Sequence, residues 1–386
     1  MIYLDNAAST QIHREVLDTM LPYLQELYGN PSSIHRYGRL AHKAIEKARK
    51  QVADLINADP SEIFFTSGGT ESNNTALCGI ALRNHGLQLI TSAIEHDAIL
   101  EPCKKLEKSG FDIIYLPVDK SGSIDPQMLK NKITEKTCLV SIMFGNNEVG
   151  TIQPIEEIGL ICNESNVPFH TDAVQAIGKI PIDVKKLGVS MLSISSHKIN
   201  GPKGIGALFI KRGLTIDPVI LGGGQERGLR SGTENVANIV GFGKACEIAK
   251  SNLDKNIVSL KKLRDYLVKR VLEEIHYVTL NGHPENRLPN NAHFTFLGVN
   301  GEDLIIKLDE HGIAASTGSA CSVHTQKASH VLQAMGFSHE QITGSLRLTV
   351  GMFNTVDEVD ETVNVLKKIV TELRSFSPFK EKYSFT

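Results

Sequence analysis

The feature that most constrains this chain is a regular alternation between residues 63 and 210. Short β-rich runs are separated mostly by segments that have the composition of helices. The runs cover residues 63–66, 89–91, 113–116, 139–142, 191–194 and 207–210, and a further strand is expected just before Asp172. Strand, helix and strand in series are typical of a mainly parallel sheet that is covered on both faces. We therefore predict an α/β fold whose functional loops lie at the carboxyl ends of the strands.

Two further segments have clear helix signals. Residues 36–56 carry apolar side chains at helical spacing with charges between them. Near the C-terminus, Thr355 and Glu358 form a capping box ahead of a periodic last helix.

The length of 386 residues allows about two or three domains. A long amphipathic helix over residues 252–275 interrupts the alternation of strands and helices, and we expect it to link two domains. We predict a large domain over residues 15–252. The small domain would combine residues 1–14 with residues 253–386.

Charge and hydropathy exclude several classes of function. The chain has 41 basic and 43 acidic side chains, a net charge of −2, so no positive excess favours nucleic acid or a membrane surface. No apolar run approaches the roughly 18 residues of a membrane helix. Residues 1–6 lack the basic start and apolar core of a signal peptide. We expect a soluble, cytoplasmic protein.

The six cysteines are scattered and form no C-x-x-C pair. This spacing argues against a zinc site or an iron–sulfur cage made by this chain alone. Five of the cysteines are interpreted as buried small hydrophobic residues. Cys321 differs, because residues 316–329 around it are small and polar, which is typical of an exposed loop.

A nicotinamide-binding Rossmann domain would share the strand–helix alternation. Its G-x-G-x-x-G fingerprint should follow an early strand. The early glycine turn, residues 67–73, reads SGGTESN and lacks that spacing. The later glycines at 201, 204 and 206 follow a lysine and do not open a helix, so we set this alternative aside.

Lys198 lies in the densest group of reactive residues, SSHKINGPKG, between two expected strands. A lysine in such a loop is suited to form a Schiff base with an aldehyde cofactor, and Ser195 and His197 supply donors for a phosphate. Asp172 ends an earlier strand. A carboxylate there would keep the ring nitrogen of pyridoxal phosphate protonated.

Two other turns follow expected strands. Residues 68–73 offer backbone N–H groups and the Thr70 hydroxyl at a helix start, which is a phosphate-binding arrangement. His96 follows the run at 89–91 and has the chemistry to stack on a pyridine ring and to move protons.

Taken together, these motifs resemble the pyridoxal-phosphate cysteine desulfurases of the IscS/NifS branch of the class-V aminotransferases. The resemblance runs from YLDNAAST at residues 3–10 to the last helix. It includes, in the family's order, GGTESNN, EH, GNNEVG, HTDAVQAIGK, SSHKINGPKG, GGGQERGLRSGTEN and STGSACS. It implies the fold of aspartate aminotransferase, fold type I of these enzymes, with a mainly parallel seven-stranded sheet in the large domain and a smaller α/β domain.

The resemblance also assigns roles to residues around the cofactor. Lys198 would be the Schiff-base lysine and Asp172 the partner of the ring nitrogen. Gln175 would meet the ring hydroxyl, and His96 would stack on the ring. The phosphate would be held by Gly69, Thr70, Ser195 and His197, with Thr233 reaching it from the other subunit of a homodimer.

For the substrate, the resemblance places Asn147 and Arg347 at the carboxylate of L-cysteine; Asn147 is also counted among the cofactor-binding residues. A planar guanidinium matches a carboxylate in two parallel bonds. Cys321 would attack the substrate sulfur and keep it as a persulfide, leaving L-alanine. The sulfur would then pass to an iron–sulfur scaffold protein or another acceptor, with tRNA thiolation as a further destination.

Two alternatives stay open at this point. A lyase or aminotransferase of the same fold, acting on selenocysteine or cysteine sulfinate, needs Lys198 and Asp172 but not Cys321. A non-catalytic assembly partner would keep the fold and dock a scaffold. The tail at residues 373–379 resembles the segment that docks the iron–sulfur scaffold. A further possibility is that Cys321 lends a ligand to a partner's cluster.

Overall fold

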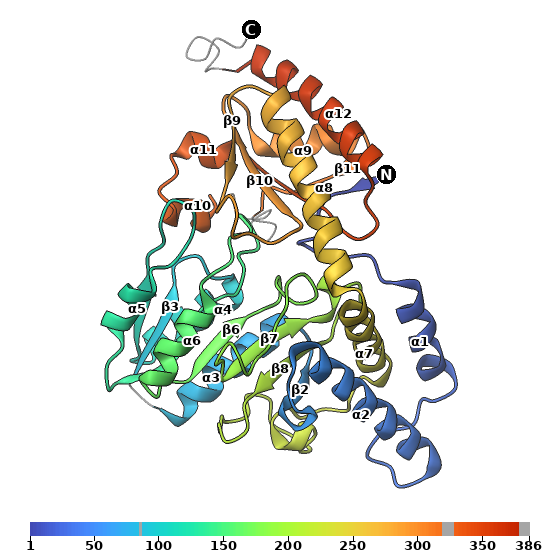
Figure 1. Ribbon diagram of the computed structural model, residues 1–386. Helices are drawn as coiled ribbons and strands as arrows, with labels where there is room; N and C mark the ends of the chain where they lie inside the picture. Colours follow the sequence, from blue (N-terminus) through green and yellow to red (C-terminus); the bar gives the residue numbers. More distant parts are fainter. Residues whose placement is uncertain (85–86, 319–327, 378–386) are drawn as a thin grey trace.

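The computed structural model describes residues 1–84, 87–318 and 328–377. Cys321 and the end of the tail therefore lie outside the described residues. In Figure 1, a large part built around one sheet forms the lower half of the molecule, and a smaller part lies above it.

The large part is organised by a seven-stranded sheet with the order β2-β8-β7-β6-β5-β3-β4. Strand β8 is antiparallel to both of its neighbours, and the remaining pairs are parallel. Every predicted run forms a strand, which confirms the mainly parallel sheet. The strands are β2 (Ile63–Thr66), β3 (Gln88–Ser92), β4 (Asp112–Leu116), β5 (Thr137–Ser141), β6 (Phe169–Asp172), β7 (Met191–Ser195) and β8 (Gly206–Ile210).

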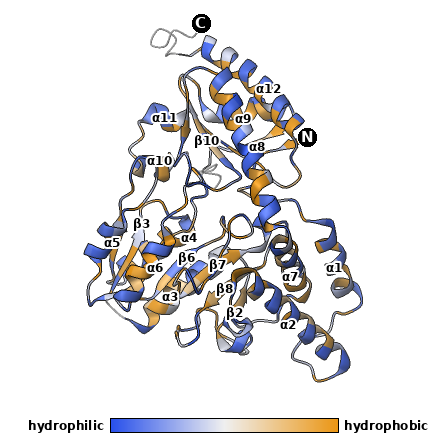
Figure 2. Cartoon of the chain, viewed as in Figure 1, coloured by the Kyte–Doolittle hydropathy of each residue, from blue (hydrophilic) through white to orange (hydrophobic). Residues whose placement is uncertain are grey.

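Successive side chains of each strand point to opposite faces of the sheet, so both faces carry apolar side chains. Helices cover both of these faces. Leu89 and Met191 pack in one hydrophobic cluster with α3 (Gly69–Arg83) and α4 (Asp97–Lys108). Their neighbours Ile90 and Leu192 pack in another cluster on the opposite side. That second cluster includes α2 (Arg36–Ile56), α6 (Ile155–Glu164) and α7 (Val236–Ser251). Figure 2 shows hydrophobic residues along the strands and the helices packed on them.

The predicted helix at residues 36–56 is confirmed as α2. It ends at Asn57, which has a left-handed backbone with φ of 57°. The other helices of the large part are α1 (Arg14–Gln25) and the short α5 (Pro126–Lys132).

The smaller part has an antiparallel sheet with the order β12-β10-β9, covered by helices. Its strands are β9 (Val278–Asn281), β10 (Asn291–Phe296) and β12 (Ser345–Thr349), and its helices are α9 (Gly301–Glu310), α10 (His330–Ala334), α11 (His339–Thr343) and α12 (Val356–Ser375). The N-terminal strand β1 (Ile2–Tyr3) pairs in parallel with β11 (Ile313–Ala314). The capping box of Thr355 and Glu358 at the start of α12 is confirmed.

A separate hydrophobic cluster holds the smaller part together. Ile2 and Leu4 pack there with residues of α8 (Leu253–Glu274), β10, β12 and α12. Helix α8 runs from the large part into the smaller one (Figure 1). These clusters support the division that we propose, with residues 15–252 as one domain and residues 1–14 and 253–386 as the other.

The described cysteines correct one expectation. Four of the five are buried as predicted, but Cys78 is only half-buried. Burial raises the pKa of each of these thiols, that of Cys138 to about 11 and that of Cys162 to about 12. They are therefore poor nucleophiles at neutral pH. Among the described residues, no helix is both long and apolar enough to cross a membrane.

His170 is an unusual residue of the sheet core, because it is a fully buried polar side chain that joins three strands. Its Nδ1 atom lies 2.8 Å from the Ser141 hydroxyl on β5, and its Nε2 atom lies 2.9 Å from the Ser193 hydroxyl on β7. Burial lowers the pKa of His170 to about 3. The imidazole is therefore neutral in the folded protein at every ordinary pH.

This burial predicts a stability that falls in acid. The unfolded chain takes up a proton at His170 near pH 6.5, whereas the folded chain does so only near pH 3, so acid favours unfolding. Each pH unit below 6.5 should cost about 1.4 kcal/mol of unfolding free energy from this residue. Urea unfolding at pH 7 and pH 5 measures the slope. His170→Asn should show a smaller loss between the two pH values; an equal loss would contradict the prediction.

Candidate active site

The predicted site residues follow the carboxyl ends of strands that run in the same direction. Because these ends meet at one edge of the sheet, loops far apart in sequence come together there. Gly69 and Thr70 follow β2, His96 follows β3, Asn147 follows β5, Asp172 ends β6, Ser195 ends β7, and His197 and Lys198 follow it.

These loops surround a cavity of about 260 Å³. Of the predicted site residues that the structure describes, its wall contains all except Thr233, namely Gly69, Thr70, His96, Asn147, Asp172, Gln175, Ser195, His197, Lys198 and Arg347. The N-terminal segment also contributes Ala7 and Ala8, which were not predicted. The structure thus brings the predicted residues to one place, while their individual roles remain proposals.

Lys198 lies at the end of a short 3₁₀ turn (Ser196–Lys198) after β7. Its amine donates hydrogen bonds to the carbonyl oxygens of Ala7 and Ala8, at 2.5 and 2.8 Å. Gln175 donates to the same Ala7 carbonyl at 2.9 Å. The N-terminal segment therefore orients two predicted cofactor ligands, and no local pattern around Lys198 indicated this.

The Asp172 carboxylate is held by hydrogen bonds at both of its oxygens. Oδ1 accepts from the backbone N–H of Val174 at 2.9 Å, and Oδ2 accepts from Nδ2 of Asn73 at 2.6 Å. Asn73 also lines the cavity, but sequence analysis did not single it out. The one available signal was its position one helical turn after Gly69.

The amino end of α3 forms another part of the wall. Gly68 caps this helix without a side-chain hydrogen bond, so the first N–H groups are available to an anion. A side chain on Gly69 would place its Cβ 2.7 Å from Cγ2 of Val174, so this turn requires glycine. Burial, followed by the charges of nearby lysines including Lys198, lowers the pKa of His197 to about 4. His197 is therefore a neutral hydrogen-bonding group at neutral pH.

His96 is both a cavity residue and the N-cap of α4. Its Nδ1 accepts a hydrogen bond from the backbone N–H of Ala98 at 3.0 Å, so the neutral ring carries its proton on Nε2. Glu95 fixes this turn by accepting from the Ser92 hydroxyl and from the N–H of Met143, at 2.6 and 2.9 Å. Burial raises the pKa of Glu95 to about 8. Sequence analysis missed this role of Glu95.

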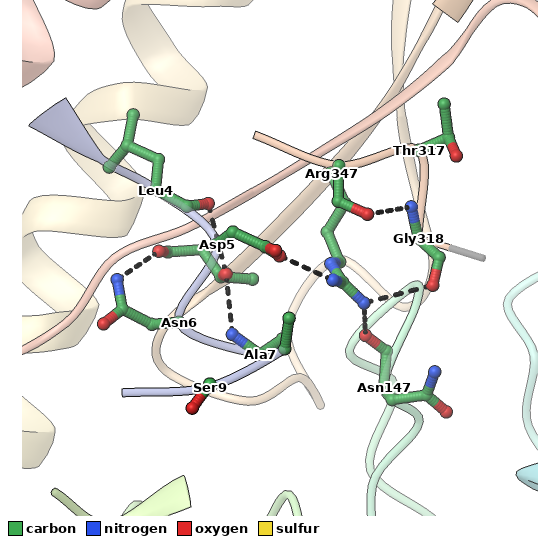
Figure 3. Close-up of polar contacts among 12 residues, drawn as sticks. Leu4, Asp5, Asn6, Ala7, Ser9, Asn147, Thr317, Gly318 and Arg347 are labelled. Atoms are coloured by element: carbon green, nitrogen blue, oxygen red, sulfur yellow. Dashed lines mark hydrogen bonds and ion pairs between the residues drawn. The ribbon is translucent and has the colours of Figure 1, made fainter. Parts of the chain in front are cut away.

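Arg347 lines the cavity from the smaller part, and Figure 3 shows its polar contacts. It is 2% exposed, and its Nη2 forms an ion pair with Asp5 Oδ1 at 2.7 Å. Its Nη1 donates to the carbonyls of Asn147 and Gly318 at 2.8 and 3.2 Å. Within the described part of the chain, its buried Nε has no partner. A donor remains for a carboxylate, although Asp5 was not anticipated.

These groups fit pyridoxal phosphate. The Asp172 carboxylate and the unpartnered Oδ1 of Asn73 are acceptors, which require a donor such as a protonated ring nitrogen. The uncapped turn of α3, with Ser195 and His197 nearby, supplies donors for a phosphate. The amine of Lys198 lines the same cavity and suits an aldehyde.

Comparison with known proteins agrees with this chemistry. The model of the family described as aminotransferase class-V matches residues 2–362. This chain belongs to the class-V aminotransferase family. Two curated relatives are both named cysteine desulfurase IscS. That of Dictyoglomus turgidum is 50% identical over 384 residues, 99% of this chain and 98% of the relative. That of Methanosarcina thermophila is 52% identical over 383 residues, 99% and 95% of the two chains.

Solved structures of similar proteins agree in fold. A NifS-like protein has a TM-score of 0.91 and 41% identity, covering 96% of this chain and 99% of its own. A structure titled SspA in complex with cysteine has a TM-score of 0.82 and 37% identity, covering 92% and 100%. The predicted class-V fold and the IscS/NifS resemblance are confirmed.

Thr233 does not line the cavity of its own chain and is exposed. Its segment is fastened to the large part at Glu226, which is buried and forms a two-point ion pair with Arg49 at 2.7 and 2.8 Å. Glu226 also accepts from the backbone N–H of Phe65 at 2.8 Å. Glu226, seven residues before Thr233, is therefore held in place against α2 and β2.

We predict that Glu226→Ala destabilises this class-V enzyme strongly, because it removes the only buried carboxylate that Arg49 contacts in the described part of the chain and leaves Arg49 with half-exposed Glu46. The expected loss of unfolding free energy is about 3–5 kcal/mol. Urea unfolding measures it. Glu46→Ala is the control, because Glu46 also pairs with Arg49 but is half-exposed, and should cost under about 1 kcal/mol. Equal effects of the two changes would refute the prediction.

Proposed function

We propose that the cavity at the carboxyl edge of the large sheet is the active site of a pyridoxal-phosphate-dependent cysteine desulfurase. The observation that carries the proposal is the single cavity shared by the amine of Lys198, the carboxylate of Asp172 and the guanidinium of Arg347. Relatives at about 50% identity along almost the whole chain bear the name cysteine desulfurase. The chain is therefore an enzyme of the pyridoxal-phosphate-dependent class.

In this proposal, each group of cavity residues holds one part of the cofactor. Lys198 would hold the cofactor aldehyde, Asp172 the ring nitrogen and Gln175 the ring hydroxyl. His96 would stack on the ring, with its Nε2 proton available to a neighbouring atom. The phosphate would be held by Gly69, Thr70, Ser195 and His197. When bound, the cofactor supplies an electron sink that weakens bonds next to the substrate α-carbon.

Arg347 would orient the substrate. Its unpartnered Nε and its Nη2 are donors in one plane, and a carboxylate accepts two parallel bonds from such a group. Asn147, whose carbonyl already fixes Nη1, would contact the same carboxylate. This arrangement directs the side chain of L-cysteine toward the rest of the cavity. A solved relative is titled as a complex with cysteine.

Cys321 would take the sulfur. A new S–S bond forms between its thiolate and the substrate sulfur, while the C–S bond breaks and the carbon gains a proton. L-cysteine and the enzyme thiol thus become L-alanine and an enzyme persulfide. The raised pKa values of the five described thiols leave none of them suited to this attack.

We also propose a cytoplasmic homodimer. The region from the second half of α1 to the start of α2 exposes large apolar side chains, which is typical of a surface that packs against another protein. They are Leu21, Leu24, Tyr28, Ile34, Tyr37 and Leu40. In a dimer, exposed Thr233 would be free to reach the partner's phosphate. The sulfur would go to an iron–sulfur scaffold protein, a use implied by the name IscS of the relatives, with tRNA thiolation as a further destination.

We predict that Cys321→Ser and Lys198→Ala fail at different steps. Cys321→Ser should keep the fold and the bound cofactor, but alanine production from L-cysteine should fall to background because no thiol accepts the sulfur. Lys198→Ala should lose the visible absorbance of the attached cofactor. Absorbance spectra, alanine assays and mass spectrometry of the persulfide measure these outcomes.

If Cys321→Ser released sulfur from cysteine at the parent rate, a lyase of the same fold would replace the desulfurase. If borohydride reduction left no adduct on Lys198 of the parent protein, the cofactor assignment itself would be wrong. In that case the chain would be interpreted as a non-catalytic assembly partner.

We predict that Arg347→Lys raises the KM for L-cysteine about tenfold or more. A lysine keeps the charge but lacks the planar pair of donors, and a hydrogen bond to a charged group contributes about 1.5–3 kcal/mol. The cofactor spectrum should not change. Steady-state kinetics with a thermal unfolding control tests this, and an unchanged KM in a folded protein would remove Arg347 from the carboxylate site.

A further inference from the structure

Asn73 stands out among the cavity residues because it contacts Asp172, the proposed partner of the cofactor ring nitrogen. It lies on α3, is 1% exposed and lines the cavity. Its side chain lies 2.6 Å from Oδ2 of Asp172, although the two residues are 99 positions apart in the chain.

The chemistry of this contact fixes the orientation of the amide. An ionised carboxylate only accepts hydrogen bonds, so the atom facing Asp172 must be Nδ2 and not Oδ1. The Oδ1 atom of Asn73 then has no partner in the described part of the chain. An unsatisfied buried acceptor costs about 1–3 kcal/mol. The bond to Asp172 must therefore be strong enough to keep the amide in this position.

Both oxygens of Asp172 are thus held from the protein side. The N–H of Val174 holds Oδ1, and the amide of Asn73 holds Oδ2. Two donors at opposite oxygens prevent rotation of the carboxylate about its Cβ–Cγ bond. The remaining lone pairs keep one fixed direction in the cavity.

We propose that Asn73 is a positioning residue for the cofactor ring, acting through Asp172. It holds the carboxylate in the one orientation that meets the ring nitrogen, and as a neutral group it adds no second negative charge there. This inference rests on the proposed function, since it takes Asp172 as the partner of the ring nitrogen.

The chain offers a matched control in the next residue. Asn74 has the same side chain on the same helix, but its amide donates to the carbonyls of Thr70 and Ala98, at 2.9 and 3.4 Å, and does not contact Asp172. Asn74→Ala therefore removes an asparagine of α3 without touching the carboxylate. Asn73→Leu tests the same contact as Asn73→Ala while keeping the volume of the side chain.

The first measurement is the dissociation constant of pyridoxal phosphate for the full-length apoprotein, followed by absorbance. Asn73→Ala and Asn73→Leu should each weaken binding about tenfold or more, the lower range for a hydrogen bond to a charged group. Asn74→Ala should bind the cofactor like the parent.

The second measurement is the pH midpoint of the visible absorbance band of the bound cofactor. If the ring nitrogen is protonated less often, its positive charge repels a proton at Nζ of Lys198 less. The pKa of that proton then rises. The midpoint should therefore move to higher pH in both Asn73 variants and stay unchanged in Asn74→Ala. A merely structural role would lower the thermal midpoint without moving this pH.

Asp172→Ala separates failure of the inference from failure of the proposed function. Parent-like affinity and midpoint in the Asn73 variants, with weakened binding in Asp172→Ala, would overturn the role of Asn73 alone. Parent-like binding in Asp172→Ala as well would overturn the assignment of Asp172 and the proposed cofactor site with it.

Discussion

The common edge at which parallel strands end is the constraint on which the rest of the structure depends. It gathers the ends of β2, β3, β5, β6 and β7, and each contributes a turn to the cavity. Antiparallel β8 begins at the same edge, where a Cβ on Gly206 would lie 2.8 Å from Cα of Gly68. The turn after β2 can approach β8 so closely because residue 206 has no side chain.

The sheet alone does not complete the site. The guanidinium of Arg347 comes from β12 of the smaller part, and it links Asp5, Asn147 and Gly318. Three segments that are distant in the sequence therefore meet on one buried side chain (Figure 3). Any shift of the smaller part relative to the sheet would move the Arg347 guanidinium relative to Lys198. In the proposed function, the position of the substrate carboxylate thus depends on how the two parts are packed.

The sequence predicted the sheet well because each strand is a local pattern of apolar residues, as Leu89 and Ile90 illustrate with their opposite faces. Residues such as Lys198 and Asp172 were predicted because their motifs are short and contiguous. The supporting contacts were missed for a physical reason. Asn73 bonds Asp172 across 99 positions, and Asp5 bonds Arg347 across 342 positions. No local periodicity encodes such a pair, and Glu95 is likewise defined only by the loops that enclose it.

The placement of the N-terminal segment has a consequence for how the protein is made. Residues 2–8 lie in the smaller part and touch both Lys198 and β12, and Ala7 and Ala8 line the cavity. During synthesis this segment emerges before the strands of the large sheet, whereas the strand that carries Arg347 emerges after them. The large sheet has all its strands by residue 210, long before that. The part of the cavity wall that Arg347 supplies is therefore synthesised well after the last strand of the large sheet, so the sheet can form before the cavity is complete.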